Sequence, residues 1–454
     1  MRLPPKLSGP GGVLCPPPKL SRLPRRARTV VAAARALARR RGVRLYLAGG
    51  VVRDLLSRRP VRDVDLVVEA DEAGAAAFVR DLARELSASA RPHGRFGTAV
   101  VTLPDGDRLD VAAARRETYS SPGALPAVAF PAAIDEDLAR RDFTVNAMAL
   151  ALSPERRPRL VDPFGGAADL SRRTLRVLHP ASFVDDPTRA LRAVRYANRY
   201  GLRLDAATRR AISRAIDEGA FDRVSGDRLR RELVKVFEEP RRAAAVRLLR
   251  RLGIDRAIAP ALGRVPREEP LLRRVEALAR EGDEPQAGWL AYLLGWAGTL
   301  RPADLRAVAD RLGLAGSERV RLLAWPATRR RLGPGLARRS VSEIARRIGG
   351  VSPDERLAAS ALLSPRDRHA LAATHRRVTR RPFTLRGADL IAAGVAPGEA
   401  VGRALSRTRD ALLDGRIASR DALAFAIRVA ARNAAARKVA ARNAERKGAR
   451  GGSA

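Results

Sequence analysis

The stretch LAGGVVRDLLSRRPVRDVDLVV, residues 47–68, decides the fold of the first part of the chain. A strand-like run over 43–47 leads into it, and the turn Gly49-Gly50 then starts a helix over 51–57. A second strand-like run follows over 61–68. Strand, turn, helix and strand in this order predict a unit of mixed α and β structure.

Two acids interrupt the second strand-like run. Side chains at positions i and i+2 of a strand project from the same face, so Asp63 and Asp65 are expected to point together. Neighbouring carboxylates repel each other, and a bound divalent cation relieves that repulsion. Mg²⁺ fits best, because it takes oxygen ligands and leaves coordination positions for phosphate oxygens. Asp110, on a strand expected over 108–112, is the candidate third acid, and a plain surface cluster of strand-end acids is the alternative.

The glycine turn ahead of these acids predicts a phosphate site. At Gly49 and Gly50 the backbone N–H groups can approach a phosphate, and the start of the following helix adds its positive dipole. Arg53, one short turn into the helix, is placed to pair with a triphosphate oxygen. A tight turn without a ligand is the alternative. The acid pair begins only thirteen residues after Gly50, which favours a nucleotide site.

The composition of the chain points to a polyanionic partner. Its 454 residues suggest about three domains, and 46% hydrophobic residues argue against wholesale disorder. Lys and Arg number 88 against 49 Asp and Glu, a formal net charge of +39, for which nucleic acid is the leading partner. Arg- and Ala-rich genomic bias is a second source of part of that excess.

Several classes of site and location are excluded or disfavoured. The single Cys15 excludes a disulfide framework and a cysteine-based zinc site. The four histidines are scattered, no GxxxxGK[ST] phosphate loop occurs, and no apolar run is long enough to cross a bilayer. A reducing cytoplasm is therefore the expected location.

The remaining pattern separates a mixed region from a helical one. A helix is expected over 73–86 and two strands over 98–103 and 108–112. A long mobile loop over 119–134 and a helix over 136–152 follow. From the helix-start signal Asp186-Pro187 onward, the whole chain is expected to be helical.

Four motifs in order resemble one known family. GGVVRDLLSRRPVRDVDLV (49–67) resembles the opening motif of the class II tRNA nucleotidyltransferases and bacterial poly(A) polymerases, members of the DNA polymerase β-like superfamily. RRDFTVNA (140–147) is similar to that family's second motif and DPFGG (162–166) to its next loop. DDPTRALRAVR (185–195) resembles its base-selecting helix. A weaker similarity to the tail of CCA-adding members covers 383–405.

The resemblance implies an α+β fold, in which an N-terminal mixed β-sheet nucleotidyltransferase head precedes an all-α neck, body and tail. With the composition along the chain it predicts these boundaries: a flexible, basic, Pro-rich extension over 1–28, the catalytic head over 29–175, a helical neck for nucleotide selection and RNA binding over 176–240, a helical body over 241–350, a helical tRNA-binding tail over 351–427 and a basic C-terminal tail over 428–454.

The resemblance also implies a mechanism. Asp63 and Asp65 would hold two Mg²⁺ ions, one activating an RNA 3′-hydroxyl and the other neutralising the triphosphate and the leaving pyrophosphate. Asp110 would complete the catalytic set, either as a metal ligand or as the group that takes the hydroxyl proton. Gly50 and Arg53 would contact phosphate.

The second motif would bind the rest of the nucleotide. Arg140 or Arg141 would grip phosphate, and Asp142 would accept a hydrogen bond from a ribose hydroxyl. A charged helix face with internal ion pairs is the alternative for such a triplet.

The base-selecting helix would use Asp186 and Arg189. Cytosine and adenine present an amino donor beside a ring-nitrogen acceptor, whereas uracil and guanine reverse that pair, so a carboxylate next to a guanidinium matches C and A. A simple N-cap is the alternative for Asp186. Arg192 and Arg195 share a helix face and would reach the triphosphate or the base, with a solvated basic stripe as the alternative. The family usually has Glu where this chain has Asp185.

The expected function is template-independent addition of C, C and A to tRNA 3′ ends from CTP and ATP, with pyrophosphate released. Addition of only CC or only A, polyadenylation, and a catalytically inactive RNA-binding protein remain alternatives. The loop over 119–134 favours the complete or A-adding versions, because in the family such a loop helps the switch from C to A.

Overall fold

The structure is a computed structural model whose description covers residues 17–61, 63–93, 97–121, 123–124, 126–265, 268–282, 284, 286–380 and 382–432. Of the flexible extension predicted over 1–28, the residues before 17 lie outside the described part, whereas the rest contains η1 (Leu20–Arg22) and the start of α1 (Arg25–Arg41). Of the basic tail predicted over 428–454, the residues from 433 lie outside it. The chain forms two compact units. Unit 1 comprises Met1–Arg264 with Ala307–Leu314, and unit 2 comprises Val265–Arg306 with Ala315–Ala454.

A mixed sheet forms the first half of unit 1. Among the described residues its strand order is β3-β4-β5-β2-β1-β8-β9. Neighbouring strands are antiparallel except β2 and β5, which are parallel. The strands are β1 (Arg44–Ala48), β2 (Asp65–Glu69), β3 (Ser89–His93), β4 (Thr98–Thr102), β5 (Arg108–Ala113), β8 (Ala149–Ser153) and β9 (Arg159–Val161).

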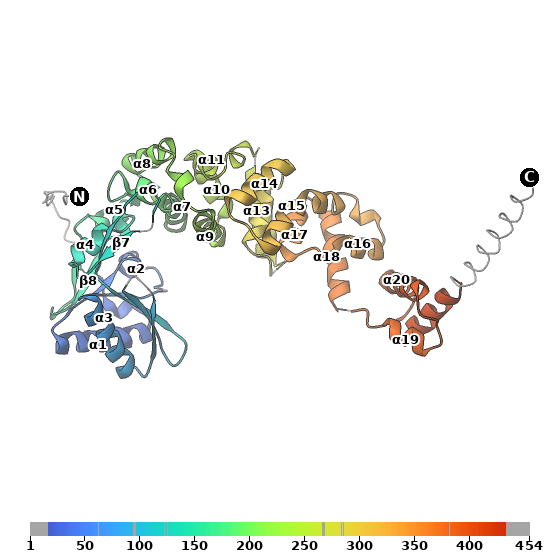
Figure 1. The fold of residues 1–454 in the computed structure, drawn as a ribbon, viewed down its shortest axis with the longest axis horizontal. Helices are drawn as coiled ribbons and strands as arrows, with labels where there is room; N and C mark the ends of the chain where they lie inside the picture. Colours follow the sequence, from blue (N-terminus) through green and yellow to red (C-terminus); the bar gives the residue numbers. More distant parts are fainter. Residues whose placement is uncertain are drawn as a thin grey trace, which may run out of the picture. The chain divides into compact units, whose positions relative to one another are not determined.

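Helices cover both faces of this sheet. On one face, α1 (Arg25–Arg41), α2 (Gly50–Leu56) and α3 (Glu72–Glu85) pack in a common core, which includes Val64 and Leu66. In Figure 1, α1 and α3 lie side by side against the sheet. The opposite face is covered by α4 (Ile134–Ala139), which packs in a second apolar cluster with residues of β1, β2 and β8. The central strand β2 is thus buried on both sides, which fixes its direction and register.

Two sequence-based expectations for this region are wrong. The predicted helix over 136–152 is divided into α4, the single 3₁₀ turn η3 (Thr144–Asn146) and strand β8. Every residue of β8 is buried, and a short apolar run buried on both faces has no alternation to distinguish it from a core helix. The predicted long loop over 119–134 contains β7 (Ala127–Ala129), which pairs with β6 (Arg116–Thr118) as a two-stranded ribbon.

Helices complete unit 1 and lead away from the sheet. After α5 (Gly166–Ser171) and the short parallel pair β10 (Thr174–Leu175) and β11 (Arg203–Leu204), all further regular structure in the described chain is helical. The two-residue β11 is the one departure from the helical region expected after Asp186. The helices are α6 (Ser182–Asp185), α7 (Thr188–Tyr200), α8 (Ala206–Asp217), η4 (Ala220–Arg223), α9 (Gly226–Glu238), α10 (Arg242–Arg251), α11 (Ile254–Ile258) and η5 (Leu262–Arg264).

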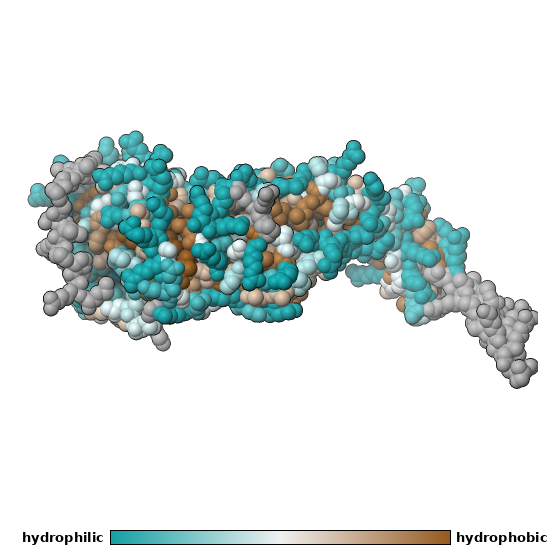
Figure 2. Space-filling view, turned by 90° about the horizontal axis from the view of Figure 1, so that it is seen from above, coloured by the Kyte–Doolittle hydropathy of each residue, from teal (hydrophilic) through white to brown (hydrophobic). Residues whose placement is uncertain are grey.

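Unit 2 is helical throughout its described part, which confirms the predicted α+β class with an all-α second region. Most of the face seen in Figure 2 is hydrophilic, and no described helix has the length and apolar character needed to cross a membrane. The helices are α12 (Glu268–Glu281), α13 (Trp289–Ala297), α14 (Pro302–Arg311, shared between the units), α15 (Gly316–Arg331), η6 (Leu336–Arg338), α16 (Val341–Ile348), α17 (Pro353–Ser360), α18 (Pro365–Arg380), α19 (Gly387–Ala392), α20 (Glu399–Leu413) and η7 (Ser419–Asp421).

Candidate functional site

A polar cavity of about 1150 Å³ lies within unit 1. Residues from the sheet, the β6–β7 ribbon, α7 and α9 line it. Gly49 and Asp110 are not among the described lining residues, but Gly49 adjoins the lining residue Gly50, and Asp110 is the strand partner of Asp65. The predicted site residues that line the cavity are Gly50, Arg53, Asp63, Asp65, Arg140, Arg141, Asp142, Asp186, Arg189, Arg192 and Arg195.

Three carboxylates lie on or next to the neighbouring strands β2 and β5. Asp65 opens β2 and lies opposite Asp110 of the parallel strand β5. Asp63 precedes β2 rather than lying on it, and its side chain is exposed, so the predicted strand over 61–68 begins too early. Burial raises the pKa of the Asp65 carboxyl to about 6, and the carboxylates of Asp110 and Asp63 act in the same direction. The Arg141 guanidinium opposes that rise.

The donor set of these acids suits a hard divalent cation. All three side chains offer carboxylate oxygens. Asp110 and Asp63 repel the negative charge of the Asp65 carboxylate, and a bound divalent cation would offset that repulsion. Within the described residues, no group of three or more His, Cys, Asp and Glu side chains is already close enough to hold a metal ion. The acids therefore fit such an ion in their chemistry, without forming a closed cage around it.

The glycine turn is shaped by Arg141. Gly49 has φ +80°, and a Cβ there would lie 2.2 Å from Arg141 Nη1, so the position requires glycine. Its N–H donates to the Met148 carbonyl at 2.9 Å, next to the end of the β1–β8 pairing. The amides of Val52 and Arg53 donate to the Gly49 carbonyl at 3.1 and 3.2 Å, so the first-turn amides of α2 that can face a ligand are those of Gly50 and Val51. Gly49 thus contributes shape rather than a donor.

Arg53 is held at the cavity wall by protein groups. It is 6% exposed and donates from Nε to Asp54 Oδ1 (2.9 Å), from Nη1 to Asn146 Oδ1 (2.5 Å) and from Nη2 to the Tyr200 hydroxyl. Its Cζ also lies 4.1 Å from the centroid of the Tyr200 ring. A guanidinium has five N–H donors, so these contacts leave two for a ligand.

A fully buried acid orients the two arginines of the second motif. Asp137, 0% exposed, accepts from Arg140 Nη2 at 2.7 Å and from Arg141 Nη2 at 2.9 Å. Burial by itself would raise the pKa of Asp137, but the two guanidinium groups hold it below its usual range. Arg140 Nη1 also donates to Glu117 of the ribbon at 2.9 Å. Both arginines are thus fixed by internal ion pairs while they line the cavity.

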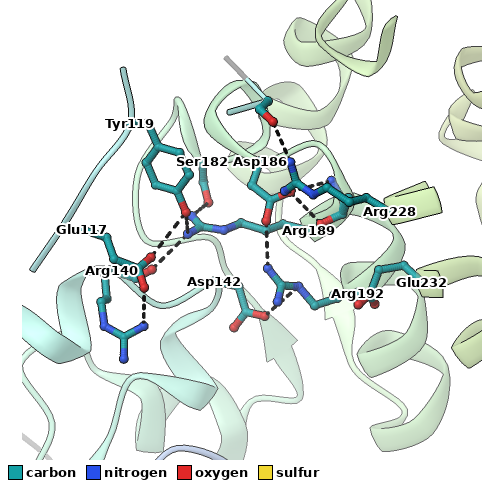
Figure 3. Close-up of polar contacts among 12 residues, drawn as sticks. Glu117, Tyr119, Arg140, Asp142, Ser182, Asp186, Arg189, Arg192, Arg228 and Glu232 are labelled. Carbon is teal, nitrogen blue, oxygen red and sulfur yellow. Dashed lines mark hydrogen bonds and ion pairs between the residues drawn. The ribbon is translucent and has the colours of Figure 1, made fainter. Parts of the chain in front are cut away.

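Arg192 lies between two acids, Asp142 and Asp186, that line the cavity with it (Figure 3). Its Nε lies 3.5 Å from Asp142 Oδ2, and its Nη2 lies 3.3 Å from Asp186 Oδ2. Asp142 Oδ1 is used by the Phe143 amide at 2.9 Å and by the Asn146 side chain at 3.0 Å. The oxygen of Asp142 that remains for a ribose hydroxyl is therefore Oδ2, which it shares with Arg192.

Asp186 fills its predicted capping role and has further partners. Its Oδ1 accepts from the Thr188 amide at 3.1 Å and from the Thr188 hydroxyl at 2.6 Å, at the start of α7. Burial would raise the pKa of Asp186, but Arg192, the Thr188 hydrogen bond and Arg228 hold it below its usual value. The carboxylate is therefore ionised, with Oδ1 used for capping and Oδ2 directed to Arg192.

Arg189 forms no ion pair with the Asp186 carboxylate within the described residues, and its role beside Asp186 in base selection stays a prediction. Its Nη1 donates to the Ser182 hydroxyl at 2.7 Å, and its Nη2 donates to the Arg140 carbonyl at 3.0 Å and to the Tyr119 hydroxyl at 3.2 Å (Figure 3). The ion-pair partners of Asp186 within the described residues are Arg192 and Arg228. Spacing along α7 put Asp186 and Arg189 within reach, but the buried hydroxyls and carbonyl offered Arg189 closer acceptors.

Arg195 belongs to the edge of the same cavity. Its Nη1 lies 3.6 Å from Glu232 Oε2, and its Nε lies 3.9 Å from Glu239 Oε1. Its side chain is 14% exposed, so a purely solvated basic stripe is not what the structure has here.

Sequence reasoning missed Asp137, Glu117, Tyr119 and Arg228, all of which line the cavity or orient its arginines. The buried acid Asp137 lies beside the RRD motif, and its i+3 and i+4 spacing to the two arginines was an available signal. Arg228 lies 42 residues from its partner Asp186, and no spacing rule connects them.

Comparison with known families matches two successive segments. The Poly A polymerase head domain matches residues 45–176, which hold the sheet and the acids. The family described as the probable RNA and SrmB-binding site of polymerase A matches residues 201–264, which hold α8 to α11.

Proteins similar to this chain include tRNA nucleotidyltransferases of two kinds and a solved CCA-adding enzyme. An A-adding tRNA nucleotidyltransferase of Geobacter sulfurreducens is 36% identical over 284 residues, which is 62% of this chain but only 32% of that protein. A CC-adding tRNA nucleotidyltransferase of Deinococcus radiodurans is 36% identical over 295 residues, 63% of this chain and 72% of that protein. The solved Thermotoga maritima CCA-adding enzyme in complex with tRNA superimposes with a TM-score of 0.70 at 27% identity, covering 90% of this chain and 96% of that one. The chain therefore belongs to the class II family of CCA-adding tRNA nucleotidyltransferases and bacterial poly(A) polymerases.

Proposed function

We propose that the chain is a template-independent nucleotidyltransferase that adds C, C and A from CTP and ATP to the 3′ end of tRNA. The observation that carries the proposal is one cavity whose lining includes both Asp63 and Asp65 and the polar cluster of Asp186 and Arg192. Such a lining offers oxygen ligands for a metal beside groups that can recognise a base.

In the proposed reaction, the 3′-oxygen of the RNA attacks the α-phosphorus, and the bond to the β-phosphate breaks to release pyrophosphate. Asp63 and Asp65 would hold Mg²⁺, which supplies the positive charge that the developing oxyanion and the leaving pyrophosphate need. Asp110, opposite Asp65, either ligates the metal or accepts the hydroxyl proton. The first-turn amides of α2 and the free donors of Arg53 and Arg141 would bind the triphosphate.

Base choice would rest on the ionised carboxylate of Asp186. Its Oδ2 is the edge that the helix cap leaves for a ligand, and an amino group of cytosine or adenine is the donor that suits it. Uracil or guanine would instead bring a carbonyl oxygen to that edge, where it would repel the carboxylate oxygen rather than donate to it.

Complete CCA addition is the leading version of this proposal. The A-adding relative of Geobacter sulfurreducens, 36% identical over 62% of this chain, favours addition of the terminal A alone. The likeness to the Thermotoga maritima CCA-adding enzyme extends through 90% of the chain and favours the complete reaction.

The deciding experiment supplies purified protein with Mg²⁺, labelled CTP or ATP, and one of three RNAs: tRNA ending before the first C, tRNA ending after the second C, or an unrelated RNA. We expect CMP incorporation on the first substrate and AMP incorporation on the second, with neither on unrelated RNA. AMP incorporation alone would replace the proposal by A addition, and long A tracts on arbitrary RNA would replace it by polyadenylation. If no nucleotide were incorporated on any RNA, the result would favour the alternative of a catalytically inactive RNA-binding protein.

A further inference from the structure

Arg228 of α9 touches two segments that are far apart in the sequence. Its Nη2 donates to Asp186 Oδ1 at 3.0 Å, and its Nη1 donates to the Gly123 carbonyl at 2.5 Å (Figure 3). Gly123 lies in the segment that joins β6 to β7, and Asp186 lies between α6 and α7. One planar guanidinium thus bridges the ribbon segment and the carboxylate proposed to select the base.

The Gly123 backbone is held at both of its polar atoms. Its N–H donates to the Asp185 carbonyl at 3.0 Å, while its carbonyl accepts from Arg228. Gly123 has φ +75°, and a Cβ there would lie 3.1 Å from the Arg223 carbonyl oxygen. This close approach and left-handed backbone favour glycine and define where the segment meets the Asp185-Asp186 pair.

The bridge determines which edge of the Asp186 carboxylate is left for a ligand. Oδ1 accepts from the Thr188 amide, the Thr188 hydroxyl and Arg228, so it has no lone pair directed at the cavity. Oδ2 faces Arg192 at 3.3 Å. Without Arg228, Oδ1 would keep only the two Thr188 donors and Oδ2 only Arg192, so the carboxylate would be held less firmly about χ2, which is a broad torsion for Asp.

We propose that Arg228 is a positioning residue for base selection, which fixes the Asp186 carboxylate and couples its orientation to the segment at Gly123. This inference rests on the proposed function. The two acceptors sit on opposite sides of a forked guanidinium, an arrangement that the point charge of a lysine ammonium does not reproduce. The charge of Arg228 alone is therefore not sufficient, and its geometry is what matters.

The test compares Arg228→Met with Arg231→Met. Arg231 is on the same helix, is 72% exposed and pairs with Asp227, so the control removes the same charge away from Asp186. We measure kcat/KM for CTP, ATP, UTP and GTP on truncated tRNA, together with the melting temperature and tRNA affinity. For Arg228→Met we expect the preference for the correct over the incorrect bases to fall about tenfold. Arg231→Met should keep the wild-type preference, and Arg228→Lys should not restore it.

A second variant tests the ribbon side of the bridge. Gly123→Ala should lower base preference in the same direction by displacing the carbonyl from Arg228. Because both changes break one connection, the double variant should lose no more preference than Arg228→Met alone. Unchanged preference in an Arg228→Met protein that melts like the wild type would overturn the inference, as would full rescue by lysine. If the wild-type protein incorporates no nucleotide, the proposed function fails instead, so the two failures are distinct.

Discussion

Some arginines that line the cavity are buried, whereas others on helices α18 and α20 of unit 2, called the outer helices below, are exposed. Arg53 and Arg189 are 6% and 3% exposed, and protein acceptors hold their guanidinium groups. Arg376 of α18 and Arg407 and Arg409 of α20 are exposed, and within the described residues they have no ion-pair partner. Buried arginines in the cavity therefore hold neighbouring groups in fixed positions, whereas the exposed arginines contribute only positive charge.

This difference predicts which property each region controls. A buried guanidinium has lost its hydration, and only well-placed acceptors offset that cost, so its position is fixed closely. An exposed guanidinium retains its water and acts over a Debye length on any polyanion. Changes in the cavity should alter rate and base choice, whereas changes on the outer helices should alter RNA affinity and its salt dependence.

The largest effect is expected from Asp63→Ala. Loss of a metal-binding carboxylate should lower the rate of nucleotide incorporation about a thousandfold or more, because the leaving pyrophosphate loses its neutralising charge. Radiolabelled incorporation measures the rate, and filter binding measures tRNA affinity, which should stay near the wild-type value. A parallel loss of affinity would show that the cavity and the outer helices are not separate in function.

The next effect concerns RNA affinity. Replacing Arg376, Arg407 and Arg409 together by Gln should weaken tRNA binding about tenfold and reduce the slope of log affinity against log salt by about one for each phosphate contact removed. The rate at saturating tRNA should be unchanged. An unaltered salt slope would contradict an RNA-binding role for these helices.

A smaller effect is expected for Asp186→Ala. The variant should admit UTP and GTP about tenfold more readily relative to CTP and ATP, because the carboxylate that penalises them is gone. Competition assays with mixed triphosphates measure this ratio. Unchanged selectivity would return Asp186 to a purely capping role, in which case only the melting temperature would fall.

The smallest effect sharpens the comparison most directly. Arg192→Lys keeps the charge but cannot reach both Asp142 and Asp186 with a fork, so kcat/KM should fall several-fold. Arg407→Lys should leave tRNA affinity within about twofold, because charge alone is needed there. If Arg192→Lys lowered kcat/KM no more than Arg407→Lys lowers tRNA affinity, the contrast between fixed cavity arginines and exposed arginines would be wrong.

The sequence predicted the sheet-and-helix plan and most of the cavity because the relevant signals are local. Gly49-Gly50, the acid pair and the RRD motif each lie within a few residues, and the chain folds them onto neighbouring elements. The helix predicted over 136–152 failed for the same reason. Its apolar run became β8, which pairs with β1 and β9 along its two edges and has its two faces in the two apolar clusters on either side of the sheet. Every residue of β8 is buried, so only these distant contacts distinguish it from a core helix.

The finer geometry of the cavity depends on contacts that no local pattern encodes. Arg189 was expected to face the base together with Asp186, and the spacing of the two residues did not indicate that Ser182, Tyr119 and the Arg140 carbonyl would accept its hydrogen bonds. Buried polar groups must all be satisfied at once, so the pairing is decided by the whole cluster rather than by the spacing of two residues.

The alternation along β2 ties catalysis to correct folding. Leu66 is 1% exposed in the core, while its neighbour Asp65 faces the cavity. If β2 slipped by one residue against β5, Leu66 would take the place of the carboxylate and a charge would enter the core. The packing that keeps Leu66 in the core therefore also keeps the Asp65 carboxylate on the cavity side of β2.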